Sequence, residues 1–309
     1  MEKHISVLLD ECIDGLNIKS DGIYVDCTLG LAGHSKEILK RIPDGKLFGF
    51  DQDTDAIKLA TEKLNAVGSN FEIIRSNFVN LKSELNERGI DKVTGFLFDL
   101  GVSSLQFDEQ ERGFSYRFDA KLDMRMDMES DLTAYKVVNE YPYRKLMKIF
   151  FEYGEEKFSQ SIARNICKWR EEKPIETTFQ LVDVIKASLP EKVKRKKGHP
   201  AKKVFQAIRI EVNDELNVFR QAIEDAISMT EVGGRLCVIT FHSLEDRICK
   251  QVFKKHATVD IPKGLPIVDS EIVPKVKLIT RKPIISTDQE LERNNRAHSA
   301  KLRICEVQL

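Results

Sequence analysis

The sequence contains no run of apolar residues that approaches the roughly 18 needed for a helix to span a membrane. Its N-terminal apolar run, Val7 to Leu9, is also too short for the hydrophobic core of a signal peptide. These absences exclude a membrane-spanning protein and argue against a secreted one. We therefore expect a cytoplasmic protein.

None of the six cysteines lies within a C-x-x-C spacing of another. They are scattered and mostly sit in apolar runs, which favours reduced, buried side chains over disulfides. Reduced thiols are typical of the cytosol. No spacing of His, Cys and carboxylate residues is typical of a metal site, so no metal is predicted.

An excess of charge of one sign is also absent, since 49 Lys and Arg balance 49 Asp and Glu. This balance excludes a uniformly basic nucleic-acid coat but not a local basic patch. Residues 192–203 contain seven Lys or Arg and no acid. Such a block is either a solvated segment or a phosphate-binding one, and its position inside a folded region favours phosphate binding.

The length of 309 residues predicts about two domains. From residue 20 to 100, short apolar runs alternate with helical patterns, which predicts a parallel, doubly wound sheet. Between about 105 and 200 we find no convincing strand. The apolar stripes there, with the capping box Thr177-x-x-Gln180, predict an all-helical insertion.

The α/β pattern resumes after the insertion. Apolar residues from Phe205 to Ile227 recur every three or four positions and predict one helix, ended by Gly233 and Gly234. Runs at 235–241, 276–285 and 301–307 predict three more strands, the last two as an antiparallel edge. The sequence thus predicts a Rossmann-like sheet of about seven strands from residues 1–104 and 205–309, with a helical domain at 105–204.

Acids follow three of the predicted strands, namely Asp26, Asp51 and Asp99. Open α/β sheets bind ligands at the carboxyl ends of their strands. Asp51 lies 21 residues after Gly30 in the numbering, a suitable separation for an acid that binds the ribose of an adenosine. Gly30 and Gly33 allow close approach of the backbone. Alternatively, Asp26 and Asp99 only cap the turns that follow them.

Two classes of adenosine ligand fit this pattern, a dinucleotide and S-adenosylmethionine. The loop Gly30-Leu31-Ala32-Gly33 is not the G-x-G-x-x-G of dinucleotide sites. A carboxylate at Asp26 would repel a pyrophosphate by roughly 4 kcal/mol at close range and would attract an ammonium group. We therefore favour S-adenosylmethionine.

Longer motifs in the chain resemble those of the bacterial MraW family, the methyltransferases of cytosine N4 in small-subunit (16S) ribosomal RNA. The matches run from residue 4 nearly to the C-terminus. They are His4–Glu11, Asp26–Ser35, Asp99–Gln106, Arg112–Ser115, Leu122–Asp127, Tyr153–Glu156, His199–Ala201, Phe205–Ile210 and Phe241–Arg247.

This resemblance implies a class I, S-adenosylmethionine-dependent methyltransferase whose inserted helical domain recognises the substrate. It implies a cytidine in the decoding region of 16S rRNA as target, with the RNA held within the small ribosomal subunit. The cofactor contacts implied or inferred are Asp26, Gly30, Ala32, Gly33, His34, Asp51, Phe78, Asp99 and Gln106. Ala32 departs from the glycine of many members, and we expect binding to survive if this residue does not need a positive φ.

The catalytic candidates are Asp99 and His242. The Asp/Asn-Pro-Pro-Tyr motif of many amino-methyltransferases is absent here, so its chemistry cannot be carried over. Our hypothesis is that Asp99, or backbone carbonyls in 99–102, accept hydrogen bonds from N4 and so stabilise the charge that develops there. His242 ends the predicted strand 235–241, where it either acts as a base or makes a structural hydrogen bond.

For RNA binding, the basic segment offers candidates that contact phosphates rather than bases, and Arg209 in the motif Phe205–Ile210 is a further candidate. Those in the segment are Lys194, Arg195, Lys196, Lys197, His199, Lys202 and Lys203. Arg125, between Asp123 and Asp127, favours a structural ion-pair network over an RNA clamp.

Three rival functions remain at this point. A Rossmann dehydrogenase is disfavoured by the acidic loop. A non-catalytic RNA-binding protein would not need Asp51 or the glycine loop. A methyltransferase of proteins or small molecules is the closest rival, and the basic segment argues against it.

Overall fold

The computed structural model describes residues 5–101, 110–195, 198–259 and 273–309. Described residues up to Gly101 and from Leu216 onward form one compact unit, the sheet unit, and those between them form a second, the helical unit. The return to the sheet unit comes later than the predicted boundary at 204/205. The reason is that the helix Lys202–Asn213 buries its apolar face in the core of the helical unit.

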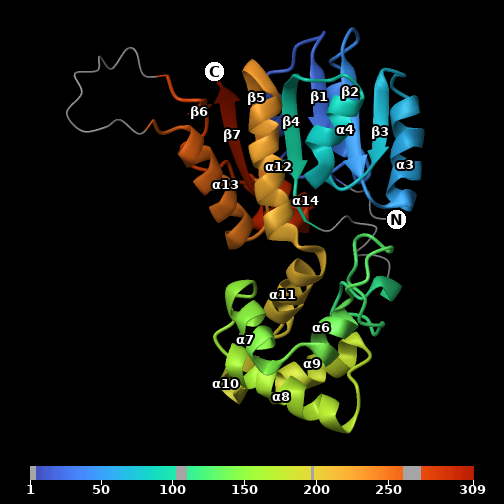
Figure 1. The fold of residues 1–309 in the computed structure, drawn as a ribbon, viewed down its shortest axis with the longest axis vertical. Helices are drawn as coiled ribbons and strands as arrows, with labels where there is room; N and C mark the ends of the chain where they lie inside the picture. The colour runs from blue at the N-terminus through green and yellow to red at the C-terminus, as the bar shows by residue number, and fades with distance from the viewer. Residues whose placement is uncertain (1–4, 102–109, 196–197, 260–272) are drawn as a thin grey trace, which may run out of the picture. The chain divides into compact units, whose positions relative to one another are not determined.

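The sheet unit is built on seven strands in the order β3-β2-β1-β4-β5-β7-β6 (Figure 1). The strands β1 to β5 are parallel to their neighbours, and β7 runs antiparallel between β5 and β6. Their bounds are β1 Ile23–Asp26, β2 Lys46–Asp51, β3 Phe71–Arg75, β4 Val93–Asp99, β5 Thr230–Thr240, β6 Val276–Leu278 and β7 Lys301–Val307. The predicted Rossmann-like sheet of about seven strands, with its antiparallel edge, is confirmed.

Helices cover both faces of this sheet, so its central strands are apolar throughout, as parallel strands require. In β4, residues Val93 to Phe98 are all buried. One core contains residues of α4, α12 and α13, and the other contains residues of α1, α2 and α3. The bounds are α1 Leu9–Leu16, α2 Gly33–Leu39, α3 Thr54–Asn65, α4 Leu81–Glu87, α12 Glu215–Met229, α13 Ser243–His256 and α14 Asp288–Arg293, with short 3-10 helices Phe78–Asn80 and Asn295–Ser299.

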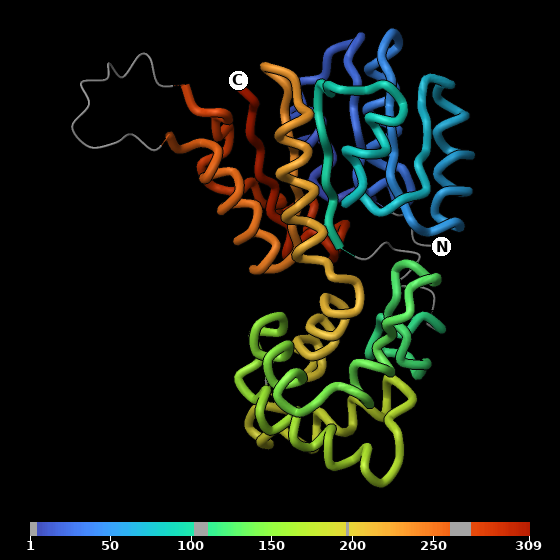
Figure 2. The backbone as a smooth tube through the Cα atoms, viewed as in Figure 1, coloured from blue at the N-terminus to red at the C-terminus, as the bar shows by residue number. Residues whose placement is uncertain are grey.

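The helical unit has its own hydrophobic core. In Figure 2 its helices α7, α8 and α9 lie side by side, in agreement with their contacts. Thr177 and Gln180 form the predicted capping box at the start of α9. The bounds are α6 Ala134–Glu140, α7 Tyr143–Glu152, α8 Ser159–Glu172, α9 Thr178–Ala187, α10 Glu191–Lys194 and α11 Lys202–Asn213, with a 3-10 helix Gln110–Arg112.

The single helix predicted from Phe205 to Ile227 is wrong. Asp214 adopts φ 48°, ψ 35°, which ends α11 before α12 begins. The apolar stripe continues across this break because both helices bury the same kind of face. Gly233 and Gly234 do not end a helix either, since they lie within β5. The run 276–285 is a strand only as far as Leu278, followed by one isolated bridge at Ile284.

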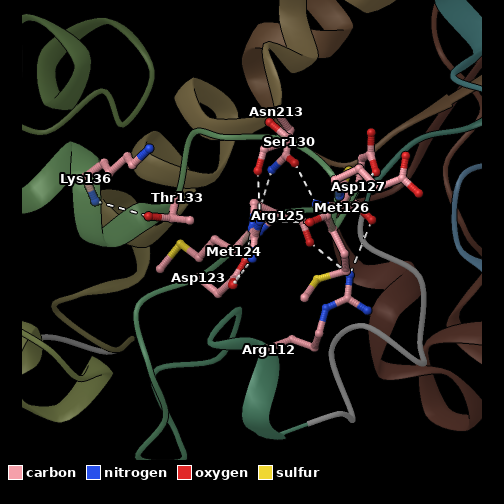
Figure 3. A network of polar contacts seen from close by, with 12 residues as sticks. Arg112, Asp123, Met124, Arg125, Met126, Asp127, Ser130, Thr133, Lys136 and Asn213 are labelled. Atoms are coloured by element: carbon pink, nitrogen blue, oxygen red, sulfur yellow. Dashed lines mark hydrogen bonds and ion pairs between the residues drawn. The ribbon is translucent and has the colours of Figure 1, made fainter.

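The predicted structural network around Arg125 is confirmed (Figure 3). Its guanidinium makes a two-pronged bond to Asp123, with N–O distances of 2.9 and 2.8 Å, and donates to the carbonyls of Met128 and Ser130. Asn213, at the end of α11, accepts from the Met126 amide and donates to the Met124 carbonyl. These hydrogen bonds of Arg125 fix the conformation of the loop from Asp123 to Ser130 within the helical unit.

Among the described residues, no helix is long and apolar enough to cross a membrane. All six cysteines are free thiols, and every one except the partly exposed Cys167 is buried. Burial raises the pKa of the Cys27, Cys237 and Cys249 thiols, which keeps them protonated and unreactive.

Gly113→Ala tests the tight loop that begins the helical unit. Gly113 has φ 72°, and a Cβ there would lie 2.2 Å from the Lys121 carbonyl oxygen. We expect strain and steric overlap to lower the free energy of unfolding by about 2–4 kcal/mol. The matched control is Gly89→Ala, which has φ 73° but open space, and should cost only about 1 kcal/mol. Urea unfolding measures both, and equal losses would contradict the steric argument.

Candidate functional site at the carboxyl ends of β1, β2 and β4

Three of the predicted acids lie on one edge of the sheet. The strand β1 pairs with β2 on one side and β4 on the other, all parallel. Their last residues, Asp26, Asp51 and Asp99, therefore share the carboxyl edge of the sheet, as the sequence predicted. Burial of three carboxylates in one region is costly unless each is hydrogen-bonded.

The glycine loop after β1 is tied to the end of β2. The Gly30 amide donates to Asp51 Oδ2 at 2.9 Å, and the Leu29 amide donates to the Phe50 carbonyl at 3.0 Å. Gly30 and Ala32 both have positive φ, at 48° and 55°. We expected alanine to replace glycine at position 32 without harm only if this residue did not need a positive φ. Ala32 does have a positive φ, so this condition is not met. An alanine there carries roughly 1–2 kcal/mol of backbone strain, partly offset by about 0.8 kcal/mol from its fully buried methyl group.

Asp51 is placed to bind hydroxyl groups. Its two oxygens accept from the amides of Gly30 and Asp53, both at 2.9 Å. A carboxylate oxygen has a second lone pair, so each can accept another hydrogen bond. Burial raises the pKa of Asp51 to about 6, and the nearby Asp53 carboxylate adds to the rise. A ligand that donates hydroxyl hydrogens would stabilise the ionised form.

Asp26 is used within the loop itself. Its side chain is buried, with Ser35 Oγ donating to Oδ2 at 2.7 Å and the Thr28 amide donating to Oδ1 at 3.1 Å. These contacts support the capping alternative for Asp26, because they hold the start of α2 against the end of β1. Sequence reasoning did not single out Thr28 or Ser35, although both lie in the motif Asp26–Ser35.

Asp99 leaves an acceptor free for a ligand. Its Oδ1 atom is buried and has no hydrogen-bond partner among the described residues. Its Oδ2 atom lies 3.7 Å from His34 Nδ1. Burial raises the pKa of Asp99 to about 6, and the His34 ring opposes that rise. An unpartnered buried oxygen is costly, so Asp99 fits an N–H donor of a bound molecule, such as an ammonium or an amino group.

His34 fixes the orientation of this pair. Its Nε2 atom lies 3.0 Å from the Val7 carbonyl oxygen, which can only accept, so Nε2 carries a proton. The Nδ1 atom therefore faces Asp99 either as an acceptor or, in the protonated ring, as a donor. The buried ring holds the Asp99 carboxyl group against the loop.

Phe78 and His242 lie in the same unit. Phe78 follows β3 and packs edge-to-face on Phe98 with ring centroids 5.9 Å apart, while remaining partly exposed. His242 is the N-cap of α13, where its side chain accepts from the Glu245 amide and the Glu245 side chain accepts in return. This capping box supports the structural alternative for His242. Gln106 lies outside the described residues.

The RNA-binding candidates divide by their partners. Arg209 makes a two-pronged pair with Glu215, both distances 2.8 Å, so its guanidinium is occupied. Lys194 pairs with Glu191, and Lys203 donates to the Glu155 carbonyl. Arg195 and Lys202 are exposed, and His199 is stacked on Tyr116. Lys196 and Lys197 lie outside the described part of the chain.

Comparison with known proteins gives consistent matches. The model described as the MraW methylase family matches residues 1–308. Ribosomal RNA small subunit methyltransferase H of Exiguobacterium sibiricum is 61% identical over 307 residues, which cover 99% of this chain and 98% of that protein.

Two solved structures are more distant. An rRNA methylase from Streptococcus thermophilus is 14% identical with a TM-score of 0.43, covering 97% of this chain and 94% of that one. A methyltransferase from Streptococcus mutans, solved in complex with SAH, is 12% identical with a TM-score of 0.45, covering 98% and 99%. These structural likenesses are weak, and only the sequence matches bear on what the chain does.

Lowering the pH should weaken binding of S-adenosylmethionine. Burial raises the pKa of Asp51 to about 6, and hydroxyl donors of the ligand bind its ionised form. Between pH 7 and 5, protonation of Asp51 should therefore lower the affinity about tenfold. Isothermal titration calorimetry measures the Kd across this range, and Asp51→Asn should remove this pH dependence. A Kd that is flat with pH would contradict this assignment.

Proposed function

This chain belongs to the MraW methylase family, and from that premise we propose that it methylates the exocyclic N4 of a cytidine in the decoding region of 16S rRNA. It is an S-adenosylmethionine-dependent methyltransferase acting on the RNA of the small ribosomal subunit. The observation that carries the N4 assignment is Asp99 Oδ1, a buried acceptor with no partner among the described residues, next to the glycine loop. An amino group supplies the N–H donor that this oxygen lacks.

The sheet unit carries residues that would contact the ribose and the adenine of the methyl donor. Asp51 would bind the ribose hydroxyls, and the loop from Gly30 to Gly33 lets the backbone approach closely. The exposed part of Phe78 would lie against the adenine. When bound, the donor supplies a methyl group activated by a positively charged sulfur. Burial raises the pKa of Asp51, and hydrogen bonds from the ribose hydroxyls would stabilise its ionised form in place of the lost hydration.

Asp99 would act on the acceptor nitrogen. The cytosine N4 is conjugated with its ring and is a weak nucleophile, so alignment with the methyl group matters more than a strong base. Orientation of this kind can supply about 7–11 kcal/mol. An N4–H bond to Asp99 would fix the nitrogen and stabilise the positive charge that would develop on it as the methyl–nitrogen bond forms and the methyl–sulfur bond breaks, leaving a neutral thioether. The nitrogen then loses one proton, and a carboxylate with a pKa of about 6 can accept it.

His34 would act as a positioning residue for this step. Its ring is anchored by the Val7 carbonyl and faces Asp99 Oδ2, which leaves Oδ1 for the substrate. We assign no proton transfer to His242, because its side chain serves the capping box of α13. The sheet unit therefore supplies the chemistry through Asp99 and His34.

The helical unit would recognise the RNA. It carries the described part of the basic segment, in which Arg195 and Lys202 are exposed. Contacts of this kind position a nucleic acid without reading its bases. The target cytidine must also leave its stack to reach a buried acceptor such as Asp99. We propose the small ribosomal subunit as partner and the cytoplasm as the place of reaction.

Methyl transfer from labelled S-adenosylmethionine to small subunits lacking the modification tests this proposal. Nucleoside mass spectrometry should find N4-methylcytidine in 16S rRNA. Label on another nucleoside or on protein would refute the N4 assignment.

Asp99→Asn tests the carboxylate. We expect kcat to fall by about 10²–10³, because an electrostatic contact made in the transition state is lost. The Kd for S-adenosylmethionine separates this role from cofactor binding, and it should change by less than the fall in kcat. The control is Glu72→Gln, the same change of carboxylate to amide in a surface pair with Lys46 and Arg88, which should leave kcat unchanged. Wild-type turnover by the Asn variant would remove Asp99 from the mechanism.

A further inference from the structure

The helical unit contains a pocket of about 380 Å³ that the reaction described above does not use. Its lining comes from the loop around Tyr116, from α9 and from His199. All of these residues belong to the helical unit, so the pocket is complete within it. Its volume lies in the range of small-ligand sites.

One side of the pocket is an ordered aromatic pair. The rings of Tyr116 and His199 stack with centroids 4.2 Å apart and planes 9° from parallel. The buried Phe205 ring packs edge-on against Tyr116 at 5.7 Å, and the Ala201 amide donates to His199 Nδ1 at 3.3 Å. These contacts fix both rings before any ligand arrives.

A third ring, that of Phe179, is presented to solvent at the same pocket. Phe179 stands in the first turn of α9 and is 44% exposed. Its amide donates to Asp119 Oδ1 at 3.2 Å, which holds this end of α9 to the loop. An exposed phenylalanine beside two fixed rings is a surface on which a flat ligand can stack.

Two cations complete the lining. Neither the Arg117 guanidinium nor the Lys186 ammonium has an ion-pair or hydrogen-bond partner in the part of the chain that the structure describes. Burial lowers the pKa of His199, and the charges of Lys186 and Arg117 lower it further, so the imidazole is neutral near pH 7. Asp183 also lines the pocket but lies outside ion-pair distance of Lys186. The ionised lining thus has one more positive than negative charge.

We propose that this pocket binds an unpaired nucleotide of the RNA substrate, with its base stacked on Phe179 and its phosphate bound by Arg117 and Lys186. The inference rests on the proposed function, because it takes the substrate to be RNA. Flat apolar rings beside unpaired cations match a base joined to a phosphate, and a phosphorylated protein side chain would leave the rings unused. Arg195 and Lys202, which are exposed and near His199 in the sequence, are further candidates for contacts to the phosphate backbone.

His199 then has a different role from the one predicted. The sequence suggested a direct RNA contact by a residue in a basic run. The structure makes it the neutral ring that supports Tyr116, while the charges come from Arg117 and Lys186. The motif His199-Pro200-Ala201 builds the wall of the pocket through the Ala201 amide.

Fluorescence anisotropy of a fluorescein-labelled single-stranded cytidine hexanucleotide tests the pocket on the full chain. Phe179→Ala should weaken binding roughly five- to a hundredfold, since one base loses its stacking partner. The control is Phe151→Ala, which removes an exposed ring from α7 of the same unit and should change nothing. Phe179 is itself exposed, so circular dichroism should show both variants folded.

The charge is tested separately through the salt dependence. Lys186→Gln should weaken binding and reduce the slope of log K against log salt by about one. Lys168→Gln on α8, an exposed lysine that does not line the pocket, is its control. Equal binding by Phe179→Ala and Phe151→Ala would overturn the pocket proposal, and so would loss of affinity in both controls.

The two proposals fail in different ways. If the wild type methylates N4 in subunits while the pocket variants bind RNA like their controls, only the pocket assignment is wrong. If the wild type methylates no rRNA yet its hexanucleotide binding depends on Phe179, the pocket stands and the proposed reaction is wrong. Inorganic polyphosphate provides the third check. If the same concentration of polyphosphate displaces half of the hexanucleotide from the wild type and from Phe179→Ala, Phe179 adds nothing to RNA binding. The site would then recognise charge alone, which would overturn the stacking argument.

Discussion

The hydrogen bond from the Gly30 amide to Asp51 joins the ends of two neighbouring strands and shapes everything at the carboxyl edge of the sheet. It positions the loop after β1, which in turn places His34 against Asp99. A carboxylate that is both buried and hydrogen-bonded to backbone amides couples the loop conformation to its own ionisation. The conformation of the loop and the ionisation of Asp51 therefore depend on each other, and both depend on what is bound.

Much of this arrangement can be predicted from the sequence. The strands that carry Asp26, Asp51 and Asp99 are short apolar runs with clear ends, and parallel topology brings those ends together without any knowledge of side-chain contacts. What the sequence does not contain is how each carboxylate is used. Asp26 and Asp99 both end a short apolar strand, yet the structure uses them differently. Ser35 and Thr28 donate hydrogen bonds to the oxygens of Asp26, whereas Asp99 Oδ1 has no partner among the described residues.

The sequence could not predict features that depend on a single residue or on a contact between distant residues. The apolar stripe through α11 and α12 has the period of one helix, and only the backbone of Asp214 divides it. Arg209 was predicted to contact RNA, and its motif does not show that its guanidinium pairs with Glu215, just beyond that division. The Tyr116–His199 stack joins residues far apart in the chain, and neither motif by itself indicates the other.

The place of the insertion also affects how the chain folds. The strands β4 and β5 are neighbours in the sheet, with Asp99 opposite Ile239, and the whole helical unit separates them in sequence. Closing such a loop carries an entropic cost that rises by about 0.6 kcal/mol for each doubling of its flexible length, and long-range pairing slows folding. A helical unit with a core of its own can condense first and shorten that flexible length. The second half of the sheet would then assemble late, so that a nascent chain completes its carboxyl-edge site only after β5 has joined β4.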